Sequence, residues 1–458
     1  MLPPHFLSRR DKKMLAVRQR VMDEIANSAC RRIRGGSKPP ALHSYASFGY
    51  WPFSQTNPVS MYTISFFLQK CKVEIDTSHN FVYNRKTFIH REGAFVIRTK
   101  KDRRALHQIP ELDRQLGETI SYLRGELEEL GCQLFSPIDG SLCAFFDFGA
   151  EKSIAFRADM DALPITENTG TPWASRHPGR MHACGHDGHM AILLELARRM
   201  GKRNRFHHNI LLVFQPAEEA SGGAKEICDS GIFTEYNVKA IFGLHLWPGL
   251  PKGKIFSRPG EMMSRSAELD VDIFGKSAHI GRSWEGVDAM EAACVYLQKA
   301  YALERSVPKD IRRLLKFGHL QSGTVRNAIA AHTRLEGGLR AFSDEVFFGL
   351  RDRLLEIAKE VEEQFGCTVK VHTSNGYPAI HNPPELCEKV AAIAPFENLP
   401  EPSMTTEDFS WYQRYVPGMF FFLGLGDSPA LHSNNFDFDE GVLTLGADFF
   451  EQLAEGWT

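Results

Sequence analysis

Short apolar segments alternate with helical patterns along this chain, and several of these segments end at acidic or histidine side chains. Three of them are residues 153–158, followed by Asp159-Met-Asp161; residues 209–215, followed by Pro216-Ala-Glu-Glu219; and residues 240–244, followed by His245. Such segments are typical of buried strands in a largely parallel sheet that is flanked by helices on both faces. Ligands bind outside the carboxyl ends of the strands in these sheets, so we expect the polar side chains to line one crevice.

One short segment is rich in potential metal ligands: residues 181–189 read Met-His-Ala-Cys-Gly-His-Asp-Gly-His. Cys184 and His186 stand two positions apart, which predicts a tight glycine-containing loop rather than one face of a helix. A helix then begins, because the apolar residues from Met190 to Ala197 follow the i, i+3, i+4, i+7 spacing. Zinc, manganese and cobalt accept mixed thiolate, imidazole and carboxylate ligands, so we predict a metal site completed by residues from the strand ends.

Glu218 and Glu219 are adjacent after a predicted strand, where neighbouring side chains usually point in different directions. One of them can bind a metal ion while the other stays free. A hydrolase needs this pair of roles, because the metal ion lowers the pKa of a water molecule and the free carboxylate takes its proton.

The middle of the chain has the pattern of a separate α+β layer. Residues 268–274 alternate apolar and acidic side chains, as a half-buried strand does. Helical patterns follow at 288–303 and at 344–364, the second ending before Gly366, and another strand is predicted at 368–372. Two strands with helices on one face of an antiparallel sheet indicate an α+β layer.

Six motifs resemble, in order and spacing, the metal-dependent amidohydrolase and metallopeptidase family of bacteria and plants. They are Arg157-Ala-Asp-Met-Asp-Ala-Leu-Pro164, His182-Ala-Cys-Gly-His-Asp-Gly-His189, Gln215-Pro-Ala-Glu-Glu219, Gly243-Leu-His245, Met404-Thr-Thr-Glu-Asp-Phe-Ser410 and Leu431-His432. The family includes hippurate hydrolase, the auxin-conjugate hydrolases, N-acyl-amino-acid deacylases and N-acetyldiaminopimelate deacetylase. The resemblance extends from about Arg103 to the C-terminus. It implies an α/β catalytic domain of the di-metal aminopeptidase type, with an inserted α+β lid or dimerisation domain.

The resemblance also implies which residues form the site. Cys184 would be the bridging thiolate between two divalent ions of manganese, zinc or cobalt. The other ligands would be His186, Glu219, His245 and His432. Glu218 would be the general base, and Asp161 would orient a ligand from behind, because a metal-bound imidazole needs its other nitrogen fixed.

Three residues of the inserted domain match functional positions of the family. His279 would stabilise the tetrahedral oxyanion, often in the active site of the partner subunit, so a homodimer is expected. Asn327 and Arg340 would bind the carbonyl and the carboxylate of the substrate, and the planar guanidinium suits a carboxylate because it makes two charge-assisted hydrogen bonds. In one departure from the family pattern, Asn327 is followed by Ala-Ile-Ala instead of Val-Ile-Pro.

The composition is that of an ordinary globular protein with two or three domains: 458 residues, 43% hydrophobic and 24% charged. No apolar run reaches the roughly 18 residues of a membrane span, and the first residues lack the pattern of a signal peptide. The nine cysteines are scattered without a framework, which fits free thiols in a reducing compartment. We therefore expect a cytoplasmic enzyme that acts on a small molecule and has no membrane partner.

Charge is unevenly distributed. The first hundred residues contain 17 Lys and Arg against 6 Asp and Glu, whereas the net charge of the whole chain is −2. We predict a basic extension of unknown fold at 1–100, catalytic segments at 101–262 and 375–458, and the inserted domain at 263–374. The predicted function is hydrolysis of the amide bond of an N-acyl amino acid. The alternative is an inactive amidohydrolase scaffold whose basic extension binds nucleic acid or a protein partner.

Overall fold

The computed structural model describes residues 74–75, 81–82 and 98–458. The chain divides into two compact units, Met1–Asn84 and Arg85–Thr458. In the first unit, strand β1 (Glu74–Ile75) pairs with β2 (Phe81–Val82) in antiparallel orientation. Most of the predicted basic extension, and with it the alternative of nucleic-acid or partner binding, lies outside the described residues.

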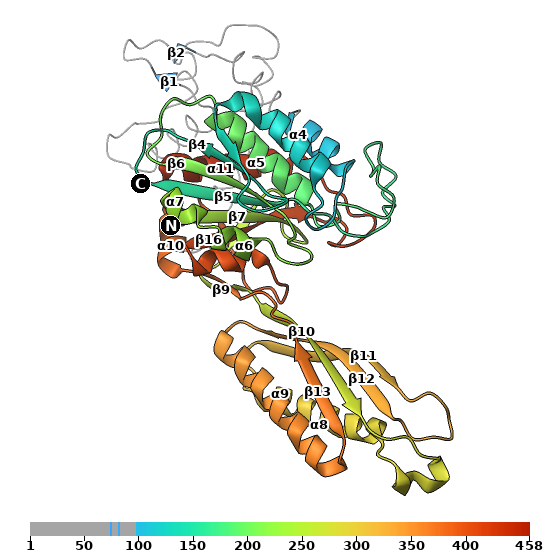
Figure 1. The fold of residues 1–458 in the computed structure, drawn as a ribbon. Coiled ribbons are helices and arrows are strands. Elements are labelled where there is room, and N and C mark those ends of the chain that lie inside the picture. The colour runs from blue at the N-terminus through green and yellow to red at the C-terminus, as the bar shows by residue number, and fades with distance from the viewer. Residues whose placement is uncertain (1–73, 76–80, 83–97) are drawn as a thin grey trace, which may run out of the picture. The chain divides into compact units, whose positions relative to one another are not determined.

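An eight-stranded sheet forms the centre of the second unit (Figure 1). In spatial order its strands are β15 (Glu397–Asn398), β8 (Ile255–Ser257), β16 (Gly418–Gly426), β7 (Val238–Pro248), β5 (Ser153–Asp159), β6 (Asn209–Gln215), β4 (Leu142–Phe146) and β3 (Gln133–Phe135). The four middle strands, β16, β7, β5 and β6, are mutually parallel, and antiparallel pairs occur towards both edges. The mostly parallel sheet predicted from the apolar segments is therefore confirmed.

Side chains alternate between two cores along the parallel strands, because successive residues of a strand point to opposite faces. In β5, for example, Phe156 belongs to one core and Ala155 to the other. The first core is covered by α4 (Gly117–Leu127), α5 (His186–Met200), α10 (Pro384–Ile393) and α11 (Val442–Gly456). The second is covered by α6 (Ala224–Asp229), α7 (Ile232–Glu235) and the 3₁₀ helix η5 (Asp408–Arg414). Among the helices of the described residues, none has the length and apolar character needed to cross a membrane.

Helix α5 is the element that follows the ligand-rich segment. Its sequence predicts one apolar face, yet all fifteen of its residues are buried, because α4, α11 and the sheet surround it. The helix begins at His186, directly after Gly185, whose φ of 89° lies in the left-handed region that glycine adopts without strain. The predicted glycine loop before the helix is therefore present, with Cys184 on the loop and His186 in the first turn.

A second sheet of four antiparallel strands has the order β11-β12-β10-β13. Its strands are β10 (Arg265–Phe274), β11 (Arg313–Ser322), β12 (His332–Ala341) and β13 (Thr368–Thr373). Helices α8 (Ala289–Ser306) and α9 (Asp344–Phe365) pack on one face and share its core. We call this layer, residues 265–373, the lid. Its two helices and strands β10 and β13 were predicted, whereas β11 and β12 were missed; the predicted domain limits stay a prediction.

The chain passes between the central sheet and the lid twice. It leaves after β9 (Gly260–Met263) and returns before β14 (Ile380–Asn382), and these two short strands pair with each other in antiparallel orientation. Ser266 and Tyr377 form a further bridge between the outgoing and returning segments. The two crossings are therefore adjacent; we call residues 374–379, the returning one, the lid linker.

Candidate metal centre

At the carboxyl edge of the central sheet, neighbouring strands end at different heights. Strand β5 pairs with β7 as far as Gly243 and ends at Asp159, whereas β7 continues to Pro248 alongside β16. The sequence predicted that this strand would stop before His245, which is wrong: His245 lies inside β7, opposite Phe422 of β16. Pairing with β16 continues past His245, whereas on the other side β5 has already ended, so His245 has no paired strand there.

Two histidines present unprotonated ring nitrogens to one cysteine. In His186, Nδ1 lies 2.7 Å from the carbonyl oxygen of Asp161, and in His245, Nδ1 lies 2.7 Å from the carbonyl oxygen of Leu246. A carbonyl only accepts, so each Nδ1 carries the proton and each Nε2 keeps a lone pair. The Nε2 atom of His245 is 3.4 Å from Sγ of Cys184, and the buried Nε2 of His186 has no hydrogen-bond partner among the described residues. This is the arrangement that fixes an imidazole for a metal ion.

A second group of ligand atoms includes the same thiol. Cys184, Glu219 and His432 bring one ligand atom each within 4.8 Å of the others, as Cys184, His186 and His245 also do. Nε2 of His432 is 3.3 Å from Oε1 of Glu219. The two groups share Cys184, so the donor set fits two soft or borderline divalent ions with a bridging thiolate. His432 has a φ of 63°, a conformation that costs a non-glycine residue about 1–3 kcal/mol and is typical of functional sites.

His189 belongs to the ligand-rich segment but is already fully bonded. Its Nδ1 lies 2.6 Å from Oδ1 of Asp159, and its Nε2 accepts a 2.9 Å hydrogen bond from the backbone N–H of Leu246. Burial alone would raise the pKa of Asp159, but His186, Arg157 and His189 hold it well below its ordinary value. His189 therefore ties the helix to β7 and to the end of β5 and has no lone pair left for a metal ion.

Asp161 holds the loop that carries the two adjacent glutamates. Its carboxylate accepts the backbone N–H of Glu218 at 2.9 Å and that of Glu219 at 3.0 Å. Sequence analysis gave Asp161 the task of orienting a metal ligand. In the structure its backbone carbonyl holds the ring of His186, and its side chain fixes both glutamates.

The two glutamates have opposite electrostatic surroundings. Burial would raise the pKa of Glu219, but His432, whose Nε2 lies 3.3 Å from the carboxylate, is the main cause that lowers it. The pKa of Glu218 is raised well above its ordinary value by burial and by the negative charge of Glu407 and Glu219. Adjacent carboxyl groups with pKa values pushed apart are characteristic of an acid–base residue beside a permanently ionised one.

Arg157 holds together the acidic groups behind the ligands, and sequence analysis gave it no role. Its Nη1 lies 2.7 Å from Asp159, its Nη2 is 3.0 Å from both Glu407 and Asp408, and its Nε donates to Gln215 at 2.8 Å. All five side chains are buried. All five residues belong to the six motifs, which is the only sign of their importance in the sequence. Their ion pairing could not be predicted, because it brings together segments some 250 positions apart in the chain.

The predicted substrate-binding residues lie in the lid rather than in the buried cluster. His279 and Asn327 are neighbours on its exposed surface, where the N–H of the residue after His279 donates to the carbonyl of Asn327 at 2.9 Å. Arg340 pairs with Ser266 at the start of β10, whereas His279 follows Phe274 at the end of that strand. The eight residue steps from Ser266 to Phe274 span roughly 27 Å of antiparallel strand, so Arg340 and His279 lie at opposite ends of the lid.

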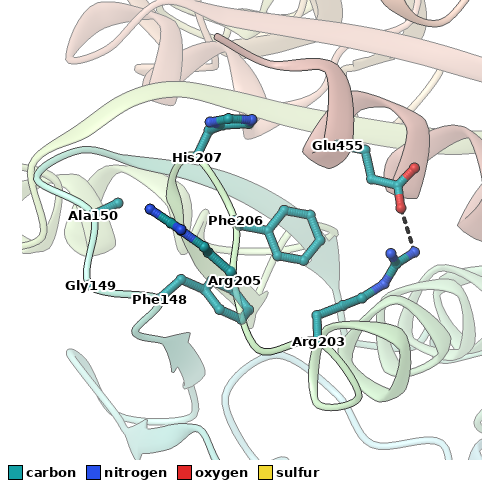
Figure 2. Close-up of a pocket in the computed structure, with 8 residues that line it drawn as sticks. All are labelled: Phe148, Gly149, Ala150, Arg203, Arg205, Phe206, His207 and Glu455. Atoms are coloured by element: carbon teal, nitrogen blue, oxygen red, sulfur yellow. Dashed lines mark hydrogen bonds and ion pairs between the residues drawn. The ribbon is translucent and has the colours of Figure 1, made fainter.

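A cavity of about 540 Å³ lies elsewhere in the same unit (Figure 2). It is lined by residues just before β5 and just before β6, which include Phe148, Arg205, Phe206 and His207, and Arg203 there pairs with Glu455. These positions mark the amino ends of parallel strands, the opposite edge of the sheet from the metal ligands. This cavity is therefore separate from the metal ligands.

Sequence and structure comparisons agree on one family. The model of peptidase family M20/M25/M40 matches residues 155–456. An uncharacterized hydrolase of Staphylococcus haemolyticus is 33% identical over 368 residues, which cover 77% of this chain and 96% of that protein. N-acetyldiaminopimelate deacetylase of Limosilactobacillus fermentum is 34% identical, with 76% of this chain and 94% of that protein covered.

Solved structures show the same architecture. A putative aminohydrolase of methicillin-resistant Staphylococcus aureus superposes with a TM-score of 0.74 at 28% identity, covering 80% of this chain and 97% of that one. A Bacillus subtilis protein described as a dinuclear metal-binding peptidase of family M20 gives a TM-score of 0.69 at 29% identity, covering 79% and 98%. The catalytic sheet with an inserted lid is therefore shared with these proteins.

Replacing Asp161 with asparagine is expected to weaken metal binding about 10- to 100-fold, because its amide can accept only one of the two backbone N–H bonds. Metal affinity is measured by titrating the metal-depleted protein with zinc or manganese. Asp147→Asn is the matched control, since Asp147 also accepts a backbone N–H, from Gly149, but at the opposite edge of the sheet. Equal affinities in Asp161→Asn and the control would show that this carboxylate does not position the ligands.

Proposed function

The chain belongs to peptidase family M20/M25/M40, a family of hydrolases, and from this premise we propose that it cleaves the amide bond of an N-acyl amino acid with two divalent metal ions. The observation that carries the proposal is the shared thiol: two groups of three ligand atoms meet at Cys184. Beside them stands Glu218, a carboxyl group that neither of these two groups requires.

Seven residues have assigned roles at the metal centre. Cys184, His186 and His245 would hold one ion, and Cys184, Glu219 and His432 would hold the other, while Asp161 holds the loop and Glu218 would remain free. When bound, the ions polarise the scissile carbonyl and lower the pKa of a water molecule. Zinc, manganese and cobalt all suit this donor set, and the presence of one soft thiolate does not select among them.

Glu218 is the proposed general base. The oxygen of a water molecule attacks the amide carbonyl carbon, Glu218 accepts the proton that the water loses, and the carbon–nitrogen bond then breaks as Glu218 gives that proton to the leaving amine. A raised pKa equips the carboxyl group for both halves of this transfer. The products are a carboxylic acid and a free amino acid.

The substrate class is supported by relatives named N-acetyldiaminopimelate deacetylase and by the lid. Asn327 and Arg340 are proposed to bind the carbonyl and the free α-carboxylate. Arg340 donates a hydrogen bond to the carbonyl of Met404, at the start of the motif that also contains Glu407, so its guanidinium stands near the catalytic domain. We propose a cytoplasmic enzyme with a small-molecule substrate.

We further propose a homodimer in which each lid serves the partner's active site. His279 and Asn327 lie at the opposite end of β10 from Arg340, so a site that uses all three needs two chains. His279 would then stabilise the oxyanion, a contribution that a correctly placed donor makes chiefly in the transition state.

Metal-depleted protein is expected to release free amine from N-acyl amino acids only after manganese, zinc or cobalt is restored. The assay uses a panel of N-acetyl, N-benzoyl and N-succinyl amino acids, with the same amino acids as methyl esters to test the carboxylate. Hydrolysis of the acids but not the esters is expected, because Arg340 recognises the carboxylate. If protein that holds two metal ions releases no amine from any member of the panel, the proposed substrate class is wrong.

Replacing Glu218 with glutamine is expected to lower kcat by at least about 100-fold, because the amide cannot take the proton of water. Metal content, measured by elemental analysis, should stay unchanged, since all five proposed metal ligands remain. Glu235→Gln, a change of the same kind at an exposed helix end, serves as the control. A kcat equal to that of the wild type in Glu218→Gln would show that Glu218 is not the general base.

Two inactive variants, Glu218→Gln and His279→Ala, are expected to recover about one quarter of wild-type activity when they are co-expressed in equal amounts. Half of the dimers are then mixed, and each mixed dimer has one site with both residues intact. Co-expression of Glu218→Gln with Glu218→Ala is the control and should recover nothing. Absence of recovery in the first pair would contradict the exchange of lid residues between subunits.

A further inference from the structure

Tyr377 lies in the lid linker and reaches the loop of the proposed base. Its hydroxyl donates a hydrogen bond to the carbonyl oxygen of Glu218 at 3.0 Å and lies 3.4 Å from the carbonyl oxygen of Ala220. Its ring packs against Gly222, where an added Cβ would stand 2.9 Å from the ring. A residue outside the six motifs therefore contacts the segment that carries both glutamates.

The peptide unit between Glu218 and Glu219 is bonded on both sides. Its N–H, that of Glu219, donates to Oδ2 of Asp161, and its C=O, that of Glu218, accepts from the hydroxyl of Tyr377. A peptide unit is planar, so holding both of its polar groups fixes its rotation about the chain. That rotation decides the directions in which the two flanking side chains leave the backbone.

The loop needs this restraint because its own conformation is unfavourable. Ala217, immediately before Glu218, has a φ of 61°, which side-chain-bearing residues adopt only at a cost of about 1–3 kcal/mol. Gly222 closes the loop with a 2.8 Å hydrogen bond to the carbonyl of Ala217. Without the two outside contacts, relaxation of the strained residue would reorient the peptide after it.

Tyr377 is itself held in place by the lid linker. Gly376 has a φ of 54°, and a Cβ there would lie 1.6 Å from the carbonyl oxygen of Ser266, so only glycine allows the two crossings to approach this closely. Ser266 and Tyr377 then pair as an isolated bridge. The tyrosine is thus anchored to the root of the lid, while its hydroxyl is anchored to the catalytic loop.

We propose that Tyr377 is a positioning residue for the reaction, which fixes the Glu218–Glu219 peptide so that one carboxylate faces the metal ligands and the other stays free as the base. This role rests on the proposed function. Because Tyr377 belongs to the linker, it also makes the orientation of the base depend on the root of the lid.

The test is Tyr377→Phe, which removes the hydroxyl and keeps the ring against Gly222. We expect kcat to fall about 10- to 100-fold with KM within about two-fold of wild type, because displacement of the base affects the chemical step more than binding. Metal content should not change, since Glu219 keeps its hydrogen bond to Asp161. Tyr122→Phe is the matched control: its hydroxyl donates to Asp102 at 2.8 Å, far along the chain from the ligand loops.

A second readout does not depend on activity. Amide hydrogen exchange in residues 217–222 of the metal-free protein should be about ten-fold faster in Tyr377→Phe than in wild type and in Tyr122→Phe, because one restraint on the loop is lost. Unchanged exchange, unchanged kcat, or a rise in KM alone would each overturn the positioning role. A wild-type protein that hydrolyses no substrate would instead overturn the proposed function, and the exchange result would still decide whether Tyr377 restrains the loop.

Discussion

Buried negative charge is the constraint on which the catalytic edge of this protein depends. Asp159, Asp161, Glu407 and Asp408 are at most 2% exposed, and Glu218 and Glu219 stand beside them. A carboxylate removed from water is costly unless a cation or hydrogen bonds compensate it. Arg157 compensates Asp159, Glu407 and Asp408, and backbone N–H groups compensate Asp161. The remaining charge faces Cys184 and the histidines, where two divalent ions fit.

This constraint also explains how distant segments come to form one site. Asp159 and Glu218 lie at or just after the ends of parallel strands, and His245 lies beyond the end of the neighbouring strand β5, so the sheet brings these residues to the same edge. Hydrogen bonds then set the orientation of these side chains. Backbone carbonyl oxygens accept from Nδ1 of His186 and of His245, and the carboxylate of Asp161 accepts the backbone N–H groups of Glu218 and Glu219. The strained backbone at Ala217 is tolerated because Asp161 holds the two residues that follow it.

The sequence predicted the parallel strands at the centre of the sheet, because buried parallel strands are short apolar runs with polar residues at their ends, but it did not predict the outer strands β15, β8, β4 and β3. It also predicted the residues that the structure brings close together at Cys184. Strand β6 was predicted residue for residue. Strands β11 and β12 were missed: β11 is an edge strand with mostly exposed, mixed side chains, and β12 contains Gly337-Gly338, so neither has a clear two-residue alternation. The roles of Arg157 and Tyr377 were beyond prediction, because each depends on which distant segments the fold places side by side; those of His279, Asn327 and Arg340 stay predictions.

The pairing of the two crossings between the central sheet and the lid has a mechanical consequence. Strands β9 and β14, extended by the bridge between Ser266 and Tyr377, form a narrow hydrogen-bonded ribbon. Such a ribbon is stiff against stretching and against shear within its plane, because both would break its hydrogen bonds, but it bends easily across its thin direction. The lid therefore moves most easily by swinging about an axis in the ribbon plane, and its largest thermal displacements are expected along this one direction.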